Sequence, residues 1–248
     1  MSPISPLCSV PETAFVFAAG RGQRMRPLTD TIPKPLVSVG GRALIDHSLD
    51  AFAAAGVARA IVNVHHLADQ IETHLAARET PRVTISDERP LLLDQGGGLR
   101  KALPLLGDAP FFICNTDAFW IGARSDNLAR LAALWNPEKM DVALLLAPRL
   151  GSVGVDWAGD FHMDSEGRLT KRRPHETADF VYAGVGVLAP RLLASEGEEV
   201  FPLAPFFFRA AEQGRLYGVP LDGRWLHVGT MAAIEEAERA MAEEGAAG

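Results

Sequence analysis

Short runs of strand-forming residues alternate with longer alanine- and leucine-rich stretches along the first two thirds of the chain. In the longer stretches apolar positions such as Leu67, Ile71 and Leu75 recur every four residues, which is typical of helices. Strands that alternate with helices in this way form parallel sheets with helical crossovers. The pattern predicts strands at residues 14–18, 60–64, 82–86, 111–114 and 142–146, and helices at residues 44–55, 67–78, 98–106 and 128–135.

The pattern changes after residue 147. It predicts a hairpin at 160–169, a strand at 180–188, and helices at 201–213 and 231–244 that flank short strands within 216–228. No linker rich in glycine, serine or proline divides the chain. We therefore expect one α/β domain with three layers, in which a mostly parallel central sheet carries helices on both faces.

Composition and charge narrow the class of protein. The chain has 248 residues, of which 48% are hydrophobic and 22% charged, so a disordered or fibrous protein is excluded. The formal net charge is −7. Binding to nucleic acid or to an anionic membrane needs a basic face that neutralises phosphates, so we expect neither partner.

Two features concern the cellular compartment. The two cysteines, Cys8 and Cys114, are too few for a disulfide framework, which fits a reducing compartment. The sequence shows neither the pattern of a secretory leader nor the roughly twenty apolar residues that span a bilayer. We therefore expect a cytoplasmic protein.

The densest candidate site follows the first predicted strand, at residues 18–29. Gly20 and Gly22 allow the backbone to approach a ligand closely, and Arg24 and Arg26 add positive charge at the same point. The third glycine of a dinucleotide-binding motif and the Gly-Lys-Ser/Thr of a P-loop are both absent. The loop predicts a polyphosphate cradle, and the alternative is a solvated surface loop.

Lys34 lies further along the same loop, between Pro33 and Pro35. The two prolines restrict the backbone on both sides of the lysine, so its ammonium group starts with limited freedom. A restrained ammonium group suits phosphate binding. The alternative is an exposed loop charge without a role.

Asp117 follows the predicted strand 111–114 and therefore lies at the carboxyl end of that strand, where open α/β sheets bind ligands. A carboxylate at this edge can hold Mg²⁺ against phosphates gathered by the first loop. The alternative is an aspartate that caps a turn.

The segment Asp94-Gln95-Gly96-Gly97-Gly98 precedes a predicted helix. Three successive glycines permit the close approach of a flat base or a ribose. They could equally form a hinge, and the sequence leaves both interpretations open.

Together these elements resemble the sugar-1-phosphate nucleotidylyltransferases. The resemblance covers nearly the whole chain, and the run from Gly96 to Pro110 is similar to the short N-acetylmuramate-1-phosphate uridylyltransferases of cell-wall recycling. The matching elements are Gly20-x-Gly22-x-Arg24 with Arg26-Pro27-Leu28-Thr29, Pro33-Lys34-Pro35, Gly96 to Gly98, Asn115-Thr116-Asp117, Tyr182-Ala183-Gly184 and Val228-Gly229-Thr230.

The resemblance implies a Rossmann-like nucleotidyltransferase fold, similar to the glycosyltransferase-A fold. Residues 1–248 form a single domain, in which 13–147 bind the nucleotide, 148–230 bind the sugar and 231–244 form a C-terminal helix. The implied reaction transfers a nucleoside monophosphate, with UTP favoured, from a nucleoside triphosphate to a sugar 1-phosphate, with release of pyrophosphate.

The resemblance also implies roles for individual residues. Arg24 and Lys34 contact the phosphates, and Asp117 binds Mg²⁺. The nucleotide is expected to contact Gly20, Gly22, Gln95 and Gly97. The sugar is expected to contact Gly184.

Two positions depart from the family pattern. His227 stands where the family usually has a second metal-binding aspartate, and imidazole is a poor ligand for Mg²⁺. His227 could act through water, accept a softer ion such as Mn²⁺, or bind no metal. Arg173 stands near the position of a family lysine and is expected to hold the sugar phosphate with a different geometry. The alternatives are a structural histidine and an exposed basic loop.

Other functions stay open at this point. His227 motivates a nucleotide-sugar binding protein without turnover, and guanylyl transfer to mannose or heptose 1-phosphate uses the same scaffold. A glycosyltransferase normally needs an Asp-x-Asp metal motif, which the sequence lacks. The sequence is compatible with a monomer or a dimer.

Overall fold

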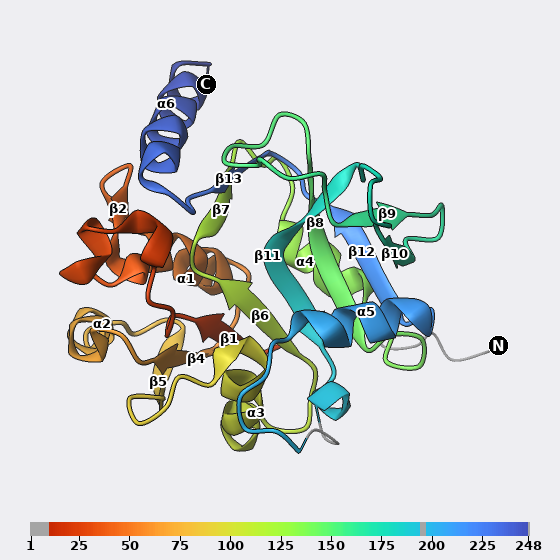
Figure 1. Cartoon of the computed structure of the whole chain (residues 1–248), viewed down its shortest axis with the longest axis horizontal. Coiled ribbons are helices and arrows are strands. Elements are labelled where there is room, and N and C mark those ends of the chain that lie inside the picture. Colours follow the sequence, from red (N-terminus) through yellow and green to blue (C-terminus); the bar gives the residue numbers. More distant parts are fainter. Residues whose placement is uncertain (1–9, 194–196, 248) are drawn as a thin grey trace.

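The structure, a computed structural model, describes residues 10–193 and 197–247, so Cys8 lies outside the described residues. A nine-stranded sheet forms its centre (Figure 1). Its strands are β1 (Thr13–Phe17), β4 (Arg59–Val64), β5 (Arg82–Asp87), β6 (Phe111–Asn115), β8 (Val142–Pro148), β9 (Phe161–Met163), β10 (Leu169–Lys171), β11 (Phe180–Leu188) and β12 (Leu216–Pro220).

The strand order is β10-β9-β11-β6-β1-β4-β5, and β8 pairs with both β11 and β12. Strands β6, β1, β4 and β5 are parallel, whereas β11 runs antiparallel to β6 and β8. The carboxyl ends of β1, β4, β5 and β6 therefore meet at one edge of the sheet, which is where ligands bind in open α/β folds.

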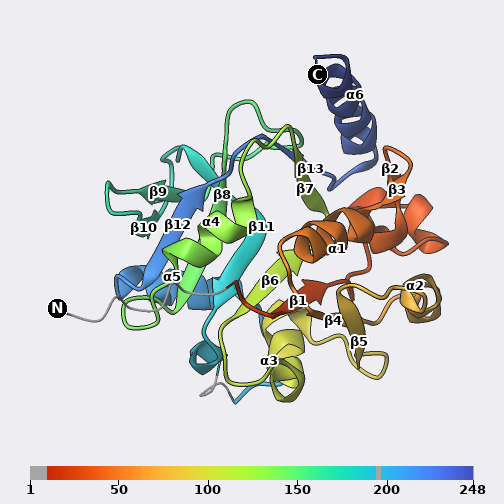
Figure 2. The same ribbon diagram turned by 180° about the vertical axis from the view of Figure 1, so that it is seen from behind.

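Helices cover both faces of the sheet, as predicted (Figures 1 and 2). Two separate hydrophobic clusters fill the space between the layers, one on each face. The first face carries α1 (Leu44–Ala54), α2 (Ala68–Leu75) and α4 (Asn127–Leu134), and the second carries α3 (Asp94–Leu106) and α5 (Ala204–Glu212). A third cluster packs α6 (Met231–Ala247) near the end of the chain against the loop after β1. No helix of the described residues has both the length and the apolar character that crossing a membrane requires.

The sequence prediction for α3 is wrong at its start. The helix begins at Asp94, so Gly96, Gly97 and Gly98 lie inside its first turns and not ahead of it. Glycine weakens a helix, yet tertiary packing outweighs this preference here. The N–H groups of Gly96 and Gly97 both donate to the carbonyl of Phe201, at 2.9 and 3.2 Å.

A two-stranded sheet that the sequence pattern did not predict brings distant residues together. Strand β7 (Ala118–Ile121) pairs antiparallel with β13 (Arg224–His227), and this register sets His227 opposite Ala118. The N–H of Val228 donates to the carbonyl of Asp117 at 2.7 Å. This pairing carries His227 to the edge of the sheet beside Asp117.

The loop after β1 is also more regular than expected. It contains the 3-10 helices η1 (Gln23–Met25), η2 (Leu28–Asp30) and η3 (Lys34–Leu36), followed by the small hairpin of β2 (Ser38–Val39) and β3 (Arg42–Ala43). Met25 is fully buried and anchors the loop in the third hydrophobic cluster. The loop therefore has a fixed shape over the edge of the sheet.

Candidate active site

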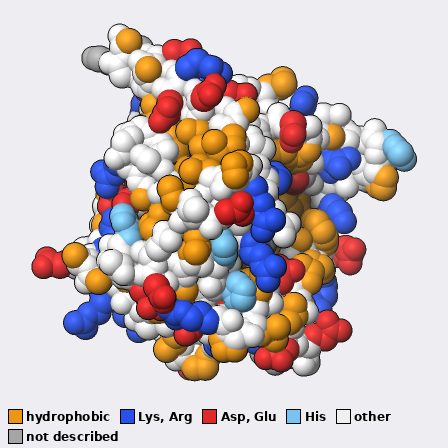
Figure 3. All heavy atoms as spheres, turned by 60° about the vertical axis from the view of Figure 1, so that its left-hand side comes forward, with side chains coloured by type: hydrophobic (Ala, Val, Ile, Leu, Met, Phe, Trp, Pro, Cys, Tyr) orange, Lys and Arg blue, Asp and Glu red, His pale blue; other side chains and the backbone are white. Residues whose placement is uncertain are grey.

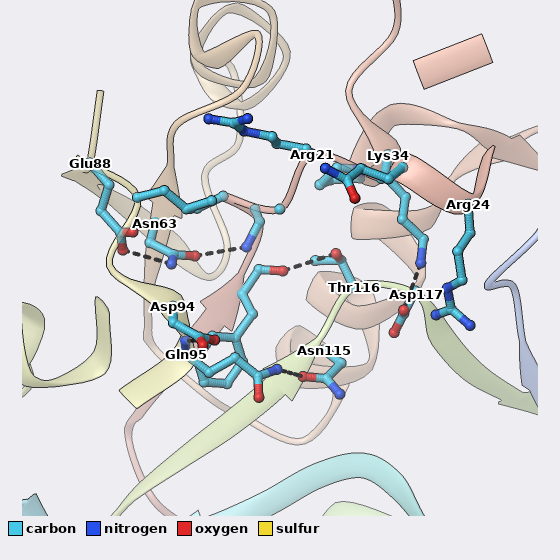
Figure 4. Close-up of a pocket in the computed structure, with 18 of the residues that line it drawn as sticks. Arg21, Arg24, Lys34, Asn63, Glu88, Asp94, Gln95, Asn115, Thr116 and Asp117 are labelled. Carbon is cyan, nitrogen blue, oxygen red and sulfur yellow. Dashed lines mark hydrogen bonds and ion pairs between the residues drawn. The ribbon is translucent and has the colours of Figure 1, made fainter. Parts of the chain in front are cut away.

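A cleft of about 660 Å³ opens at the carboxyl ends of β1, β4 and β6. Figure 4 shows how its polar residues lie: Lys34, Asp117 and Arg24 on one side, Asn63 and Glu88 on the opposite side, and Gln95 with Asn115 along the third. Basic side chains also gather in a line beside the hollow on the face shown in Figure 3. The cleft is large enough for a nucleotide.

The glycine loop forms one wall of this cleft. Gly22 has φ +62°, and a Cβ there would lie 2.8 Å from Cγ2 of Thr29, so glycine is required. A Cβ at Gly20 would meet no atom within 4 Å, because this residue borders the open cleft. Within the described residues, no group accepts a hydrogen bond from the N–H of Gly20, Arg21 or Gly22. The loop can thus offer free amide donors to an anion.

Lys34 and Asp117 form a close ion pair on one side of the cleft. Lys34 Nζ lies 2.6 Å from Asp117 Oδ2, and the two side chains are 13% and 23% exposed. Burial acts to raise the pKa of Asp117, but the interactions with His227 and Lys34 outweigh it and hold this pKa well below its usual range. Asp117 is therefore a carboxylate at neutral pH, and it accepts the hydrogen bond that holds the Lys34 side chain at the sheet edge.

His227 faces the same carboxylate. Its Nδ1 lies 3.1 Å from the carbonyl oxygen of Gly154, and a carbonyl only accepts, so Nδ1 carries a hydrogen and donates. Its Nε2 lies 3.6 Å from Asp117 Oδ2. The ring stacks on Trp225 with centroids 5.5 Å apart, which fixes its orientation. The ring nitrogen that faces Asp117 is therefore set by the surrounding structure.

The donor set fits a divalent metal ion only in part. Among the described residues, no cluster of three or more His, Cys, Asp and Glu side chains could enclose a metal ion. Mg²⁺ commonly binds one or two carboxylates and completes its shell with water and substrate phosphates. Asp117 fits this requirement, with Oδ2 shared with Lys34. Nε2 of His227 adds one nitrogen donor, which suits Mn²⁺ better than Mg²⁺.

Gln95 lines the cleft, but Gly97 does not. The Gln95 side chain donates to Oδ1 of Asn115 at 3.2 Å, whereas Gly97 is buried against the chain at residue 199. Cβ atoms at Gly96, Gly97 and Gly98 would lie 2.4, 2.3 and 2.4 Å from the ring of Phe201, the carbonyl of Glu199 and the carboxylate of Glu88. The three glycines admit neighbouring parts of the protein, and the expected contact of Gly97 with a base or ribose stays a prediction.

A second hollow, of about 370 Å³, adjoins the first and shares Arg24, Asn115 and Asp117 with it. Gly184 lines this hollow, at a point where the register of β11 shifts between Tyr182 and Gly186. The hollow also contains Trp157, Asp160, Trp225 and His227. Indole faces and a carboxylate suit the apolar and hydroxyl-bearing sides of a sugar ring.

Asp160 is held in this second hollow by two donors. Trp157 Nε1 and the N–H of Tyr182 donate to its two carboxylate oxygens, at 3.0 and 2.9 Å. Burial raises the pKa of Asp160 above its usual value, although these two donors oppose the shift. No sequence motif singled out Asp160, because its position in the second hollow depends on how residues 148–182 fold.

Arg173 lies away from both hollows. Its side chain is 83% exposed, it pairs with Glu176 at 3.9 Å, and it borders a separate surface hollow beside Lys171. The expectation that Arg173 holds the sugar phosphate is therefore not supported by its position. It matches the alternative of an exposed basic loop.

Asn63 and Glu88 are cleft residues that the sequence analysis missed. Both are buried, and Asn63 Nδ2 donates to Glu88 Oε1 at 2.8 Å. One signal was present in the sequence: Asn63 interrupts the apolar strand 60–64, and an amide in a buried strand needs hydrogen-bond partners.

A mixed, mostly parallel sheet with a glycine loop after its first strand and a lysine–carboxylate pair at the strand ends defines a nucleotide-binding α/β protein. The family of MobA-like NTP transferase domains matches residues 14–199, and the chain belongs to this family of nucleotidyltransferases.

Two curated relatives extend this likeness over the whole domain. The chain is 44% identical over 241 residues to the N-acetylmuramate alpha-1-phosphate uridylyltransferase of Caulobacter vibrioides, covering 96% of this chain and 100% of that protein. It is 34% identical to the protein of the same name from Neisseria meningitidis, covering 91% of this chain and 96% of that one.

A solved structure supports the fold. The inositol-1-phosphate CTP transferase from T. maritima superposes with a TM-score of 0.76 at 16% sequence identity, covering 94% of this chain and 97% of that one. This likeness bears on the fold alone.

Proposed function

We propose that this protein is a uridylyltransferase that joins UMP from UTP to N-acetylmuramate 1-phosphate and releases pyrophosphate. The names of the two relatives favour this base and this sugar. The observation that carries the proposal is the Lys34–Asp117 pair, which lines the same cleft as the free amide groups of the glycine loop. Such a reaction belongs to the recycling of cell-wall sugars, in the cytoplasm where UTP is made.

The reaction needs two polyanions held in line. A phosphate oxygen of the sugar 1-phosphate attacks the α-phosphorus of UTP, the bond from this phosphorus to the bridging oxygen breaks, and pyrophosphate leaves. The larger hollow has room for the nucleotide and the adjoining one for the sugar. Because Arg24 and Asp117 border both hollows, the reacting phosphates meet beside these two residues.

The protein side chains supply mainly charge and position. Lys34 and Arg24 stabilise the negative charge that grows on the transferred phosphate, and the amides of Gly20 and Gly22 orient the remaining phosphates. Asp117, with His227, would hold a divalent metal ion, Mg²⁺ or Mn²⁺, and a bound ion would neutralise phosphate charge. In this proposal residues 13–147 bind the nucleotide, and residues 148–230 bind the sugar.

A pyrophosphate-release assay tests the proposal directly. The purified protein is mixed with each of the four nucleoside triphosphates and with N-acetylmuramate, N-acetylglucosamine, glucose and mannose 1-phosphates, with Mg²⁺ or Mn²⁺. We expect release only when both substrates are present, with the highest rate for UTP and N-acetylmuramate 1-phosphate. Release that is fastest with GTP and mannose 1-phosphate would make the protein a guanylyltransferase instead.

His227 favours one further candidate, a nucleotide-sugar binding protein without turnover, because an imidazole and not a second carboxylate faces Asp117. That candidate predicts binding of UTP or a UDP-sugar by calorimetry without release of pyrophosphate from any pair of substrates. Turnover with any pair excludes it.

A further inference from the structure

Glu88 is a fully buried carboxylate whose two oxygens are both hydrogen-bonded. Oε1 accepts from Asn63 Nδ2 at 2.8 Å (Figure 4), and Oε2 accepts from the N–H of Leu93 at 3.2 Å. Among the described residues no lysine, arginine or histidine side chain lies within ion-pair distance of it. A buried carboxylate is costly unless its neighbours satisfy it, so these hydrogen bonds hold the group in one place.

The hydrogen bonds continue to the start of the glycine loop. Asn63 Oδ1 accepts from the N–H of Ala18 at 2.7 Å, and Ala18 begins the loop that contains Gly20 and Gly22. The chain Ala18–Asn63–Glu88–Leu93 therefore links the start of the glycine loop to the segment that leads into α3. These are the two segments between which the large cleft opens.

Helix α3 packs tightly against the Asn63–Glu88 pair and restricts the movement of both side chains. Gly98 packs so closely that a Cβ there would lie 2.4 Å from Glu88 Oε1 and 3.0 Å from Asn63 Nδ2. His65 fixes the backbone as well, because its Nδ1 lies 2.7 Å from the carbonyl oxygen of Glu88 and donates to it. Both the side chain and the backbone of Glu88 are thus held between β4, β5 and α3.

We propose that Asn63 and Glu88 are positioning residues for the nucleotide: they set the distance between the glycine loop and the segment before α3, and so determine the affinity for a nucleoside triphosphate. Both residues border the cleft, but Glu88 is 0% and Asn63 only 3% exposed, so they act through these two segments and not through contact with the nucleotide. The inference rests on the proposed function insofar as the ligand is a nucleoside triphosphate.

A polarity swap tests this role. In Glu88→Gln the new side-chain NH₂ faces one of the two donors that Glu88 accepts from, Asn63 Nδ2 or the N–H of Leu93, so one hydrogen bond is lost. In Asn63→Asp two carboxylates face each other, so the hydrogen bond between the side chains is lost. In the double variant the new carboxylate at position 63 still accepts from the N–H of Ala18. The new amide at position 88 donates its NH₂ to that carboxylate, and its oxygen accepts from the N–H of Leu93. The double variant thus restores all three hydrogen bonds, and only the one between the side chains at positions 63 and 88 runs in the reverse direction.

We expect the Kd of UTP, measured by calorimetry, to rise about tenfold or more in each single variant and to return to within about threefold of the wild type in the double variant. KM for UTP should follow the Kd, whereas kcat and KM for the sugar 1-phosphate should change little. Glu138→Gln, at an exposed glutamate outside the cleft, is the matched control and should leave every value unchanged.

Two results would overturn the inference. If the double variant binds UTP as weakly as the single variants, the carboxylate of Glu88 acts on the nucleotide directly. If the single variants lower the melting temperature but bind UTP like the wild type, the pair has only a structural role. Because UTP binding is measured without a sugar, the test gives an answer even if the protein releases no pyrophosphate and the proposed function fails.

Discussion

Replacement of Lys34 by alanine is the most informative single change in this protein. Lys34 Nζ lies 2.6 Å from Asp117, and with 13% of its side chain exposed the charge is poorly screened by solvent. A fixed charge or donor directed at the transition state contributes about 10²- to 10³-fold to kcat, or about 2.7–4 kcal/mol. We expect Lys34→Ala to lower kcat by that factor, with a smaller effect on KM for UTP.

The loss should not come from unfolding. The Lys34–Asp117 pair is largely buried, so breaking it should reduce the free energy of unfolding by about 1–3 kcal/mol, between the cost for an exposed pair and that for a fully buried one. This is less than the roughly 5–15 kcal/mol that stabilises a typical domain, so the variant should stay folded. Circular dichroism and thermal denaturation check this point, and a continuous pyrophosphate assay gives kcat and KM.

Arg26→Ala is the matched control for this experiment. Arg26 lies in the same loop, pairs with the exposed Asp30 at 3.1 Å and does not border the cleft. It should keep kcat within about twofold of the wild type, as expected for a surface substitution. If Lys34→Ala turned over as fast as Arg26→Ala, the assignment of Lys34 to the transferred phosphate would be refuted.

Three more predictions concern particular side chains. Gly98→Ala should lower stability by about 1–3 kcal/mol because its Cβ meets Glu88, whereas Gly20→Ala, which faces open space, should melt like the wild type; denaturant titration compares the two. The pKa of Asp117 is lowered on folding, so its contribution to stability is present above the unfolded pKa and is lost as the pH falls below about 4; acid titration should show this loss in the wild type and not in Asp117→Asn. Arg173→Ala should leave KM for the sugar 1-phosphate within about twofold of the wild type, and a tenfold increase would show that this exposed loop reaches the substrate.

The strands and most helices could be predicted from the sequence because their apolar positions repeat with the period of one element. The start of α3 could not, because the N–H groups of Gly96 and Gly97 in its first turn bind the carbonyl of Phe201, which is distant in the sequence. Strand β7 was missed for the same reason, since its only partner among the described strands is β13. Elements stabilised by distant partners leave little local signal.

The candidate site divides in a similar way. Gly20, Lys34 and Asp117 stand at loop and strand-end positions that can be recognised locally, and the fold brings them to one cleft. The Asn63–Glu88 link depends on the parallel register of β4 and β5, which no local pattern encodes. Arg173 was assigned by likeness to a family position, but its side chain lies in solvent.

The central claim is that the glycine loop, Lys34 and Asp117 act on one triphosphate. A crystal structure with a non-hydrolysable UTP analogue and Mn²⁺ tests it most directly. We predict phosphate oxygens within hydrogen-bond distance of Lys34 Nζ and of the amides at Gly20 and Gly22, with the metal ion on Asp117. A triphosphate bound elsewhere, with Lys34 still paired only with Asp117, would contradict the claim.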